Sequence, residues 1–174
     1  MKTFYFILGL LAATNCFSQA NRKVSTFVSF GANKTIYDRT ITNNNGGPGF
    51  GLQTVVNTKT FITPLMEINA ALFAGTKELY LTTGGKPIES KSDVLSMYVG
   101  PMFGATKRLF ISTTIGTSLY NNKAHFGLRP SVGFYPSQSR KWTTRVSYTN
   151  VFQRDAISKE SFGYLSFGVG IKLF

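Results

Sequence analysis

Cysteine, histidine and charge are all scarce in this chain of 174 residues. It has one cysteine and one histidine, which excludes a disulfide scaffold, a cysteine-rich metal centre and a site built from paired histidines. Charged residues make up 15% of the sequence and aromatic residues 14%, so the composition is not that of a disordered chain. After residue 20 the chain has no apolar run long enough for a transmembrane helix. We therefore expect one folded domain with no metal and no cofactor.

Residues 1–20 have the pattern of an export signal. Lys2 provides the positive start, residues 4–13 form the apolar segment, and Ser18 and Ala20 are the small residues that a signal peptidase recognises. A lipoprotein signal at Cys16 is the alternative, although the residue before it is not small. We predict cleavage after Ala20, which leaves residues 21–174 as an exported domain without cysteine.

From residue 21 onward the hydrophobic pattern repeats every two residues, which is typical of strands. The runs are rich in Val, Ile, Thr, Phe and Tyr and are bounded by Asn, Gly, Lys and Ser. Several are about 10 to 12 residues long, whereas ordinary strands have about 5 to 6 and a strand crossing a bilayer needs about 9 to 11. The eight runs are 24–31, 50–57, 62–73, 94–104, 109–120, 125–135, 142–151 and 162–173.

The two faces of each run favour a membrane barrel over a soluble one. In the run 109–120, Ile111 and Ile115 share one face, whereas Ser112 and Thr114 share the other. The apolar faces carry no charge, and the opposite faces mix small, polar and aromatic side chains. A soluble barrel would place charged residues on its water-facing side, so this pattern fits lipid outside and a packed polar lumen inside. We predict an all-β fold, an eight-stranded antiparallel up-and-down transmembrane β-barrel.

The lengths of the connections predict its orientation. Short connections follow residues 57, 104 and 135, and longer ones follow residues 31, 73 and 151. The connection 121–124 departs from this alternation, because it is also short. Short periplasmic turns and longer outer loops are the arrangement of outer-membrane barrels. We expect residues 78–82 to extend the strand 62–73 above the membrane.

In these features the chain resembles the small eight-stranded outer-membrane β-barrel proteins of Gram-negative bacteria, most of all those of the Bacteroidetes type. The resemblance covers residues 21–174 and rests on the alternating strands, the signal ending Phe17-Ser18-Gln19-Ala20 and the closing segment 168–174 with its C-terminal Phe. It implies a location in the cell outer membrane, contact with outer-membrane lipids and lipopolysaccharide, and handling by the barrel-assembly machinery during biogenesis. Such barrels have many functions, so the resemblance predicts architecture more than activity.

Basic residues gather at the predicted periplasmic end. The chain has a net charge of +12, but an exported chain with its basic residues in turns is not expected to bind nucleic acid. Anchoring at anionic lipid headgroups and docking to an acidic periplasmic partner are the two interpretations that remain. The eight basic residues assigned to this end are Arg22, Lys23, Lys59, Lys107, Arg108, Arg140, Lys141 and Lys172. The candidate docking face consists of Lys59, Lys107, Arg108, Arg140 and Lys141.

Three charged residues fall on predicted lumen faces: Glu67, Arg129 and Arg145. Their strands lie on opposite walls of an eight-stranded barrel, so we expect Glu67 to pair with one or both arginines. A structural ion cluster is the simpler interpretation, because an unpaired charge there is costly, and a proton or ion path is the alternative. Aromatic residues predicted in the same lumen argue against a continuous channel. They are Phe27, Tyr98, Phe110, Tyr120 and Tyr135.

Aromatic residues on the lipid faces are predicted to form a girdle at each membrane interface. Those of the outer interface are Phe30, Phe50, Phe126 and Tyr148. Those of the periplasmic interface are Phe103, Phe134 and Trp142.

Nothing in the sequence indicates catalysis. The single histidine, His125, lies at the outer end of its run, and no motif marks a serine near it. We favour a non-catalytic outer-membrane barrel with a structural or surface-interaction role. The alternatives are an accessory subunit of a larger outer-membrane secretion, uptake or assembly complex, a narrow pore, a lipid A-modifying enzyme and a soluble periplasmic lipid-binding barrel.

Overall fold

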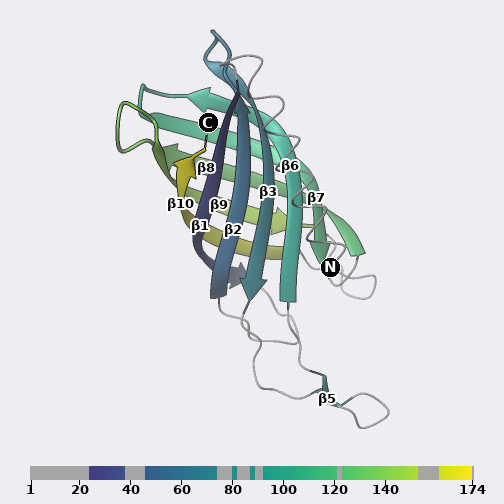
Figure 1. Ribbon diagram of the computed structural model, residues 1–174. Coiled ribbons are helices and arrows are strands. Elements are labelled where there is room, and N and C mark those ends of the chain that lie inside the picture. The colour runs from purple at the N-terminus through teal and green to yellow at the C-terminus, as the bar shows by residue number, and fades with distance from the viewer. Residues whose placement is uncertain are drawn as a thin grey trace.

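The computed structural model describes residues 24–37, 46–73, 80–81, 87–88, 92–120, 123–152 and 161–173. Eight long antiparallel strands in this part of the chain close into a barrel (Figure 1). They are β1 (Val24–Tyr37), β2 (Gly46–Val56), β3 (Ile62–Phe73), β6 (Ser92–Gly104), β7 (Leu109–Tyr120), β8 (Lys123–Phe134), β9 (Trp142–Val151) and β10 (Phe162–Lys172). The predicted export signal and the C-terminal Phe174 lie outside the described residues.

The strand order confirms the predicted eight-stranded antiparallel up-and-down barrel. Barrel strands that follow one another in the chain are neighbours in the sheet, and β1 pairs with β10 to close it. Three strands have the predicted ranges, and β1 differs most, because its residues 32–37 pair with residues 163–167 of β10 instead of leaving the sheet. No described helix is long and apolar enough to cross a membrane.

Of the residues 78–82 expected to extend β3, only Tyr80 and Leu81 lie within the described part of the chain, and they are not part of the barrel sheet. Strand β4 (Tyr80–Leu81) pairs with β5 (Pro87–Ile88) in a separate two-stranded sheet. The reason is local, because an antiparallel partner only a few residues away meets the backbone hydrogen-bonding groups of Tyr80 and Leu81.

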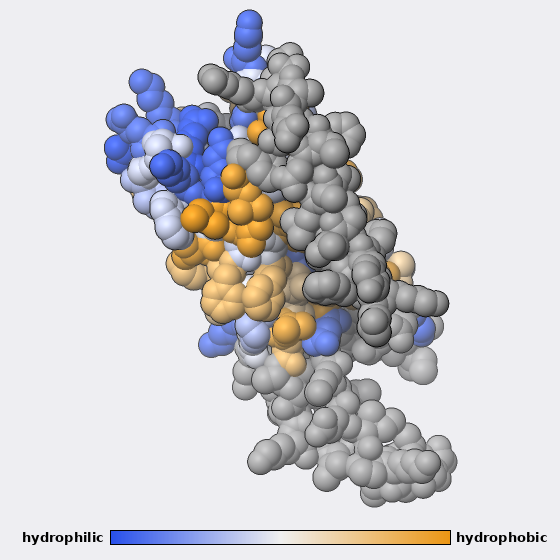
Figure 2. All heavy atoms as spheres, viewed as in Figure 1, coloured by the Kyte–Doolittle hydropathy of each residue, from blue (hydrophilic) through white to orange (hydrophobic). Residues whose placement is uncertain are grey.

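Large apolar side chains are exposed on the outside of all eight barrel strands, and polar side chains are buried inside. On β7, Ile111 and Ile115 are exposed, whereas Ser112 and Thr114 are completely buried. Figure 2 shows the outer residues as an orange band on the visible wall, between blue residues at the two ends of the barrel. This burial pattern is the reverse of that in a soluble barrel.

The lumen is filled in three layers. At the end near residues 73 and 162, the rings of Phe73, Phe162 and Tyr164 lie 5.3 to 5.5 Å from one another. A polar layer around Glu67 occupies the middle. At the other end a second apolar layer is buried, with Phe27, Val55, Leu65, Met102, Phe110 and Tyr135. The predicted lumen position of the Tyr120 side chain lies outside the described residues.

Glycine makes room for the aromatic ring in this second apolar layer. Gly133 on β8 is the cross-strand partner of Phe110 on β7, and a Cβ atom at Gly133 would overlap the Phe110 ring. The ring has little freedom to move away, because its centroid lies 4.9 Å from that of Tyr135. The close approach of Phe110 therefore requires a residue without a side chain at position 133.

We expect Gly133→Ala to lower the free energy of unfolding by about 1–3 kcal/mol, because the added methyl group overpacks the lumen. Chemical unfolding in detergent micelles measures the change. Gly104→Ala is the matched control, since its added Cβ would meet only the Thr106 carbonyl oxygen, at 4.0 Å. Equal stability of the two variants would contradict this account of the Phe110 site.

Candidate functional site

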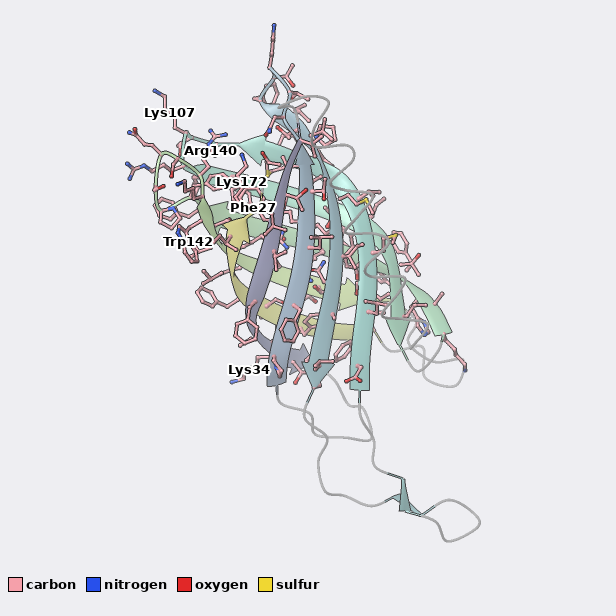
Figure 3. The ribbon with its side chains drawn as sticks, viewed as in Figure 1. Phe27, Lys34, Lys107, Arg140, Trp142 and Lys172 are labelled. Carbon is pink, nitrogen blue, oxygen red and sulfur yellow. The ribbon has the colours of Figure 1, made fainter. Side chains whose placement is uncertain are left out.

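The end of the barrel that carries the short turns 57–61, 105–108 and 135–141 contains an open cavity of about 560 Å³. We call this end the turn end and the cavity the turn-end cup. Figure 3 shows Phe27, Lys107, Arg140 and Lys172 gathered there, with Lys34 at the opposite end of the barrel. The cup lies at the end of the barrel where the sequence predicted a docking face.

The floor of the cup is apolar and buried. Phe27 of β1 and Phe110 of β7 come from different walls and both approach the ring of Tyr135, with centroids 6.1 and 4.9 Å away. Burial raises the pKa of the Tyr135 phenol above its ordinary value, even though Arg140 and Arg145 act in the opposite direction. The phenol is therefore uncharged at neutral pH, and the floor presents rings without a negative charge.

The rim of the cup is basic. Lys107 comes from the turn between β6 and β7, Arg140 from the turn between β8 and β9, and Lys172 from the end of β10. None of the described residues that line the cup is acidic. Three cations around one concave surface create a positive potential that attracts anions from solution.

Arg140 is held in place by its turn. Its φ of 51° lies in the left-handed region, and its backbone N–H donates a hydrogen bond of 3.1 Å to the Ser137 carbonyl. Its guanidinium donates a 3.3 Å hydrogen bond to the Lys107 carbonyl and lies 5.4 Å from the centre of the Tyr135 ring. The contact joins two turns, so this cation is positioned over the floor before any ligand arrives.

The predicted docking face is divided by the structure. All five of its residues are exposed at the turn end, but only Lys107 and Arg140 line the cup. The third cup cation, Lys172, was not included in the predicted face. Its position opposite Ile171 and Leu173 in the alternation of β10 was the signal for an inward side chain. Lys59, Arg108 and Lys141 are at the turn end but do not line the cup.

The three charged lumen residues meet in the middle layer. Arg145 Nη1 donates a hydrogen bond to Glu67 Oε1, and Arg129 Nε lies 3.4 Å from Glu67 Oε2. Arg129 also donates a 3.0 Å hydrogen bond from Nη1 to the Thr149 hydroxyl. Glu67 is fully buried and contacts both arginines, so the cluster of two cations and one anion carries one net positive charge.

His125 has a serine as its cross-strand partner, which the sequence reasoning did not single out. Ser118 on β7 pairs with His125 on β8. However, Ser118 is completely buried, and its hydroxyl is hydrogen bonded to the Tyr98 hydroxyl and, at 2.9 Å, to the Ser96 hydroxyl. A serine nucleophile has to reach its substrate, so this arrangement is a packing network in the lumen.

The aromatic residues predicted for the lipid faces have exposed or half-buried side chains. Phe134 and Trp142 flank the turn between β8 and β9 and are exposed. Phe30 and Phe50 differ from their predicted places near strand ends, because β1 continues to residue 37 and β2 begins at residue 46. The two rings are cross-strand partners and lie 5.3 Å apart. Exposed are Phe30, Phe50, Phe126, Phe134 and Trp142, and half-buried are Phe103 and Tyr148.

No family model and no curated protein matches the chain. Among solved structures, it is similar to Ail, the attachment invasion locus protein of Yersinia pestis, with 13% identity, a TM-score of 0.57, and coverage of 86% of this chain and 97% of Ail. The outer membrane protein Ail in a phospholipid bilayer nanodisc matches at 15% identity with the same TM-score, covering 86% of this chain and 99% of Ail. A de novo designed transmembrane β-barrel matches at 8% identity and a TM-score of 0.50, covering 86% of this chain and 95% of the design. The chain therefore has the fold of eight-stranded outer-membrane barrels.

Proposed function

We propose that this chain is an integral outer-membrane barrel protein that acts without catalysis, in a structural or surface-interaction role. The observation that carries the proposal is the belt of exposed apolar side chains around a polar lumen, since a surface of this kind is stable in lipid and not in water. The proposal includes the Bacteroidetes-type relationship, contact with outer-membrane lipids and lipopolysaccharide, and assembly by the barrel-assembly machinery.

The filling of the lumen supports an interaction role over a narrow pore. Aromatic layers lie above and below the ion cluster, and a ring packed in such a layer blocks the passage of hydrated ions. The burial of Ser118 argues against a nucleophile formed by Ser118 and its cross-strand partner His125. Interaction with other molecules then takes place at the two ends of the barrel.

An accessory subunit of a larger outer-membrane complex is the second candidate function. The observation that favours it is the turn-end cup, with its three cations and apolar floor. In the proposed orientation the cup opens to the periplasm, where a secretion, uptake or assembly machine would dock.

We expect the chain to remain in the membrane pellet after carbonate extraction and to be released by mild detergent, because its apolar belt is embedded in lipid. The native mass of the released particle then separates the two candidates. A mass near one chain plus a detergent belt supports the stand-alone role, and a much larger particle supports the accessory subunit. Release by carbonate alone would contradict membrane integration.

A further inference from the structure

We propose that the turn-end cup binds an acidic peptide segment of a periplasmic partner, with carboxylates at Lys107, Arg140 and Lys172 and an aromatic or aliphatic side chain against the apolar lining. This inference rests on the proposed function in one respect, namely that the turn end faces the periplasm. It deepens the accessory-subunit candidate by naming the chemistry of the partner and the residues that recognise it.

The cup is closed at its inner end. Its floor is closed by Phe27, Phe110 and Tyr135, and the Glu67 cluster fills the lumen beyond them. A solute that enters the cup therefore has to leave by the same opening. A closed, charged depression of this kind suits binding better than conduction.

The chemistry of the rim selects carboxylates. The Arg140 guanidinium has a planar set of donors that matches a carboxylate, whereas Lys107 and Lys172 provide point charges on either side. No described acidic residue lines the cup, so its cations have no internal counter-charge there. A segment with two or more carboxylates would supply that charge.

The apolar lining of the cup favours an occupant with an apolar part. The rings of the floor are buried, but Phe61 lines the same cavity and is 70% exposed, so an apolar group that covers it gains free energy. The volume of about 560 Å³ lies within the range of ligand sites, which is about 300–1,000 Å³. A free inorganic anion would leave the Phe61 ring uncovered, whereas a peptide carries both kinds of group in one chain.

The position of the cup argues against a lipid as the occupant. The rings of the cup floor face the lumen, so an acyl chain would have to leave the bilayer to reach them. The turn end also has three cations that do not line the cup, Lys59, Arg108 and Lys141, and these suit lipid headgroups.

The backbone at Arg140 provides an independent observation. A backbone φ of 51° is disfavoured for most residues that carry a side chain, and glycine or asparagine would suit this position of the turn better. The turn nevertheless has an arginine whose guanidinium lies over the floor. Strain of this kind at an open cavity points to a functional role for the side chain.

The test uses the purified full chain in detergent and isothermal titration calorimetry. The probe is the synthetic peptide acetyl-Asp-Glu-Phe-Asp-Glu-amide, compared with the same peptide carrying Gly in place of Phe. The cup variant is Lys107→Gln/Arg140→Gln/Lys172→Gln. Its matched control is Lys59→Gln/Arg108→Gln/Lys141→Gln, which removes the same charge from the same end of the barrel.

We expect the cup variant to weaken binding of the Phe peptide by about tenfold or more and the control variant by less than about threefold. The Gly peptide should bind the unchanged protein about fivefold or more weakly than the Phe peptide. Arg140→Gly separates binding from folding, because it relieves the backbone strain. It should be at least as resistant to unfolding as the unchanged chain and still bind the peptide several-fold more weakly.

Three outcomes would overturn the proposal. Equal weakening by the two triple variants would mean that the whole end attracts anions without a site. Equal binding of inorganic phosphate and the Phe peptide would mean a small-anion site, and displacement of the peptide by phosphatidylglycerol would mean a lipid site.

Binding in detergent does not depend on where the chain resides in the cell. If the chain is integrated in the membrane but does not bind the peptide, only the proposed peptide site is rejected. If carbonate releases the chain and it still binds the peptide, only the proposed location is rejected.

Discussion

Glu67→Gln is expected to lower the free energy of unfolding of the barrel by about 3–5 kcal/mol, because it leaves two buried guanidinium groups without a counter-charge. Glu67 is fully buried, and the side chains of Arg129 and Arg145 are exposed by only 6% and 9%. Water can therefore do little to replace the lost carboxylate. Unfolding by urea, followed by the fluorescence of the single tryptophan, Trp142, measures the loss.

The arginine variants should lose stability in an order that a general packing defect would not produce. Arg129→Met should cost less than Glu67→Gln, because it leaves one cation and one anion that are still hydrogen bonded. The triple variant Glu67→Gln/Arg129→Met/Arg145→Met should recover much of the stability lost in Glu67→Gln, since a neutral cluster of similar shape is often nearly as stable as an ionic one. A Glu67→Gln protein as stable as the unchanged chain would contradict a stabilising role for the ion cluster.

Ile115→Lys is expected to lower stability in lipid bilayers by about 2–4 kcal/mol, because it places a charge at mid-depth on the lipid-facing side. Ile115 lies in the middle of β7, and its side chain is 47% exposed on the outer surface. The matched control is Leu109→Lys, on the same face but at the first residue of the strand, where the expected cost is about 0–1 kcal/mol. Unfolding from liposomes measures both.

The comparison between these two positions tests the membrane directly. In a water-soluble barrel an exposed isoleucine can be changed to lysine with an effect within about 0.5 kcal/mol, and the depth of the residue does not matter. Equal costs at positions 109 and 115 would therefore reject membrane insertion, whatever the fold. A graded cost, largest at mid-strand, would support it.

The sequence by itself determined which side chains face inward and which face outward. Successive side chains of a strand point to opposite faces, so the placing of Ile111 and Ser112 follows from their order alone. The lumen position of Glu67, Arg129 and Arg145 and the outward aromatic residues follow from the same local rule. The polar end of β1 was missed, because Asn33 and its neighbours read as a loop, yet Asn33 accepts a 2.7 Å hydrogen bond from Ser166 of β10.

Closure of the barrel decided which side chains contact one another in the lumen and at the turn end. The order of residues left open whether one or both arginines pair with Glu67. Only the fold brings both to it, Arg145 from 78 residues away on the opposite strand. The turn-end cup likewise exists only in the tertiary structure, where Lys107 and Arg140 come from two separate turns, Lys172 from the end of β10, and Phe27 and Phe110 from different walls. The physical reason is that alternation is a property of each strand, whereas a lumen contact depends on registers and turns that many distant residues set together.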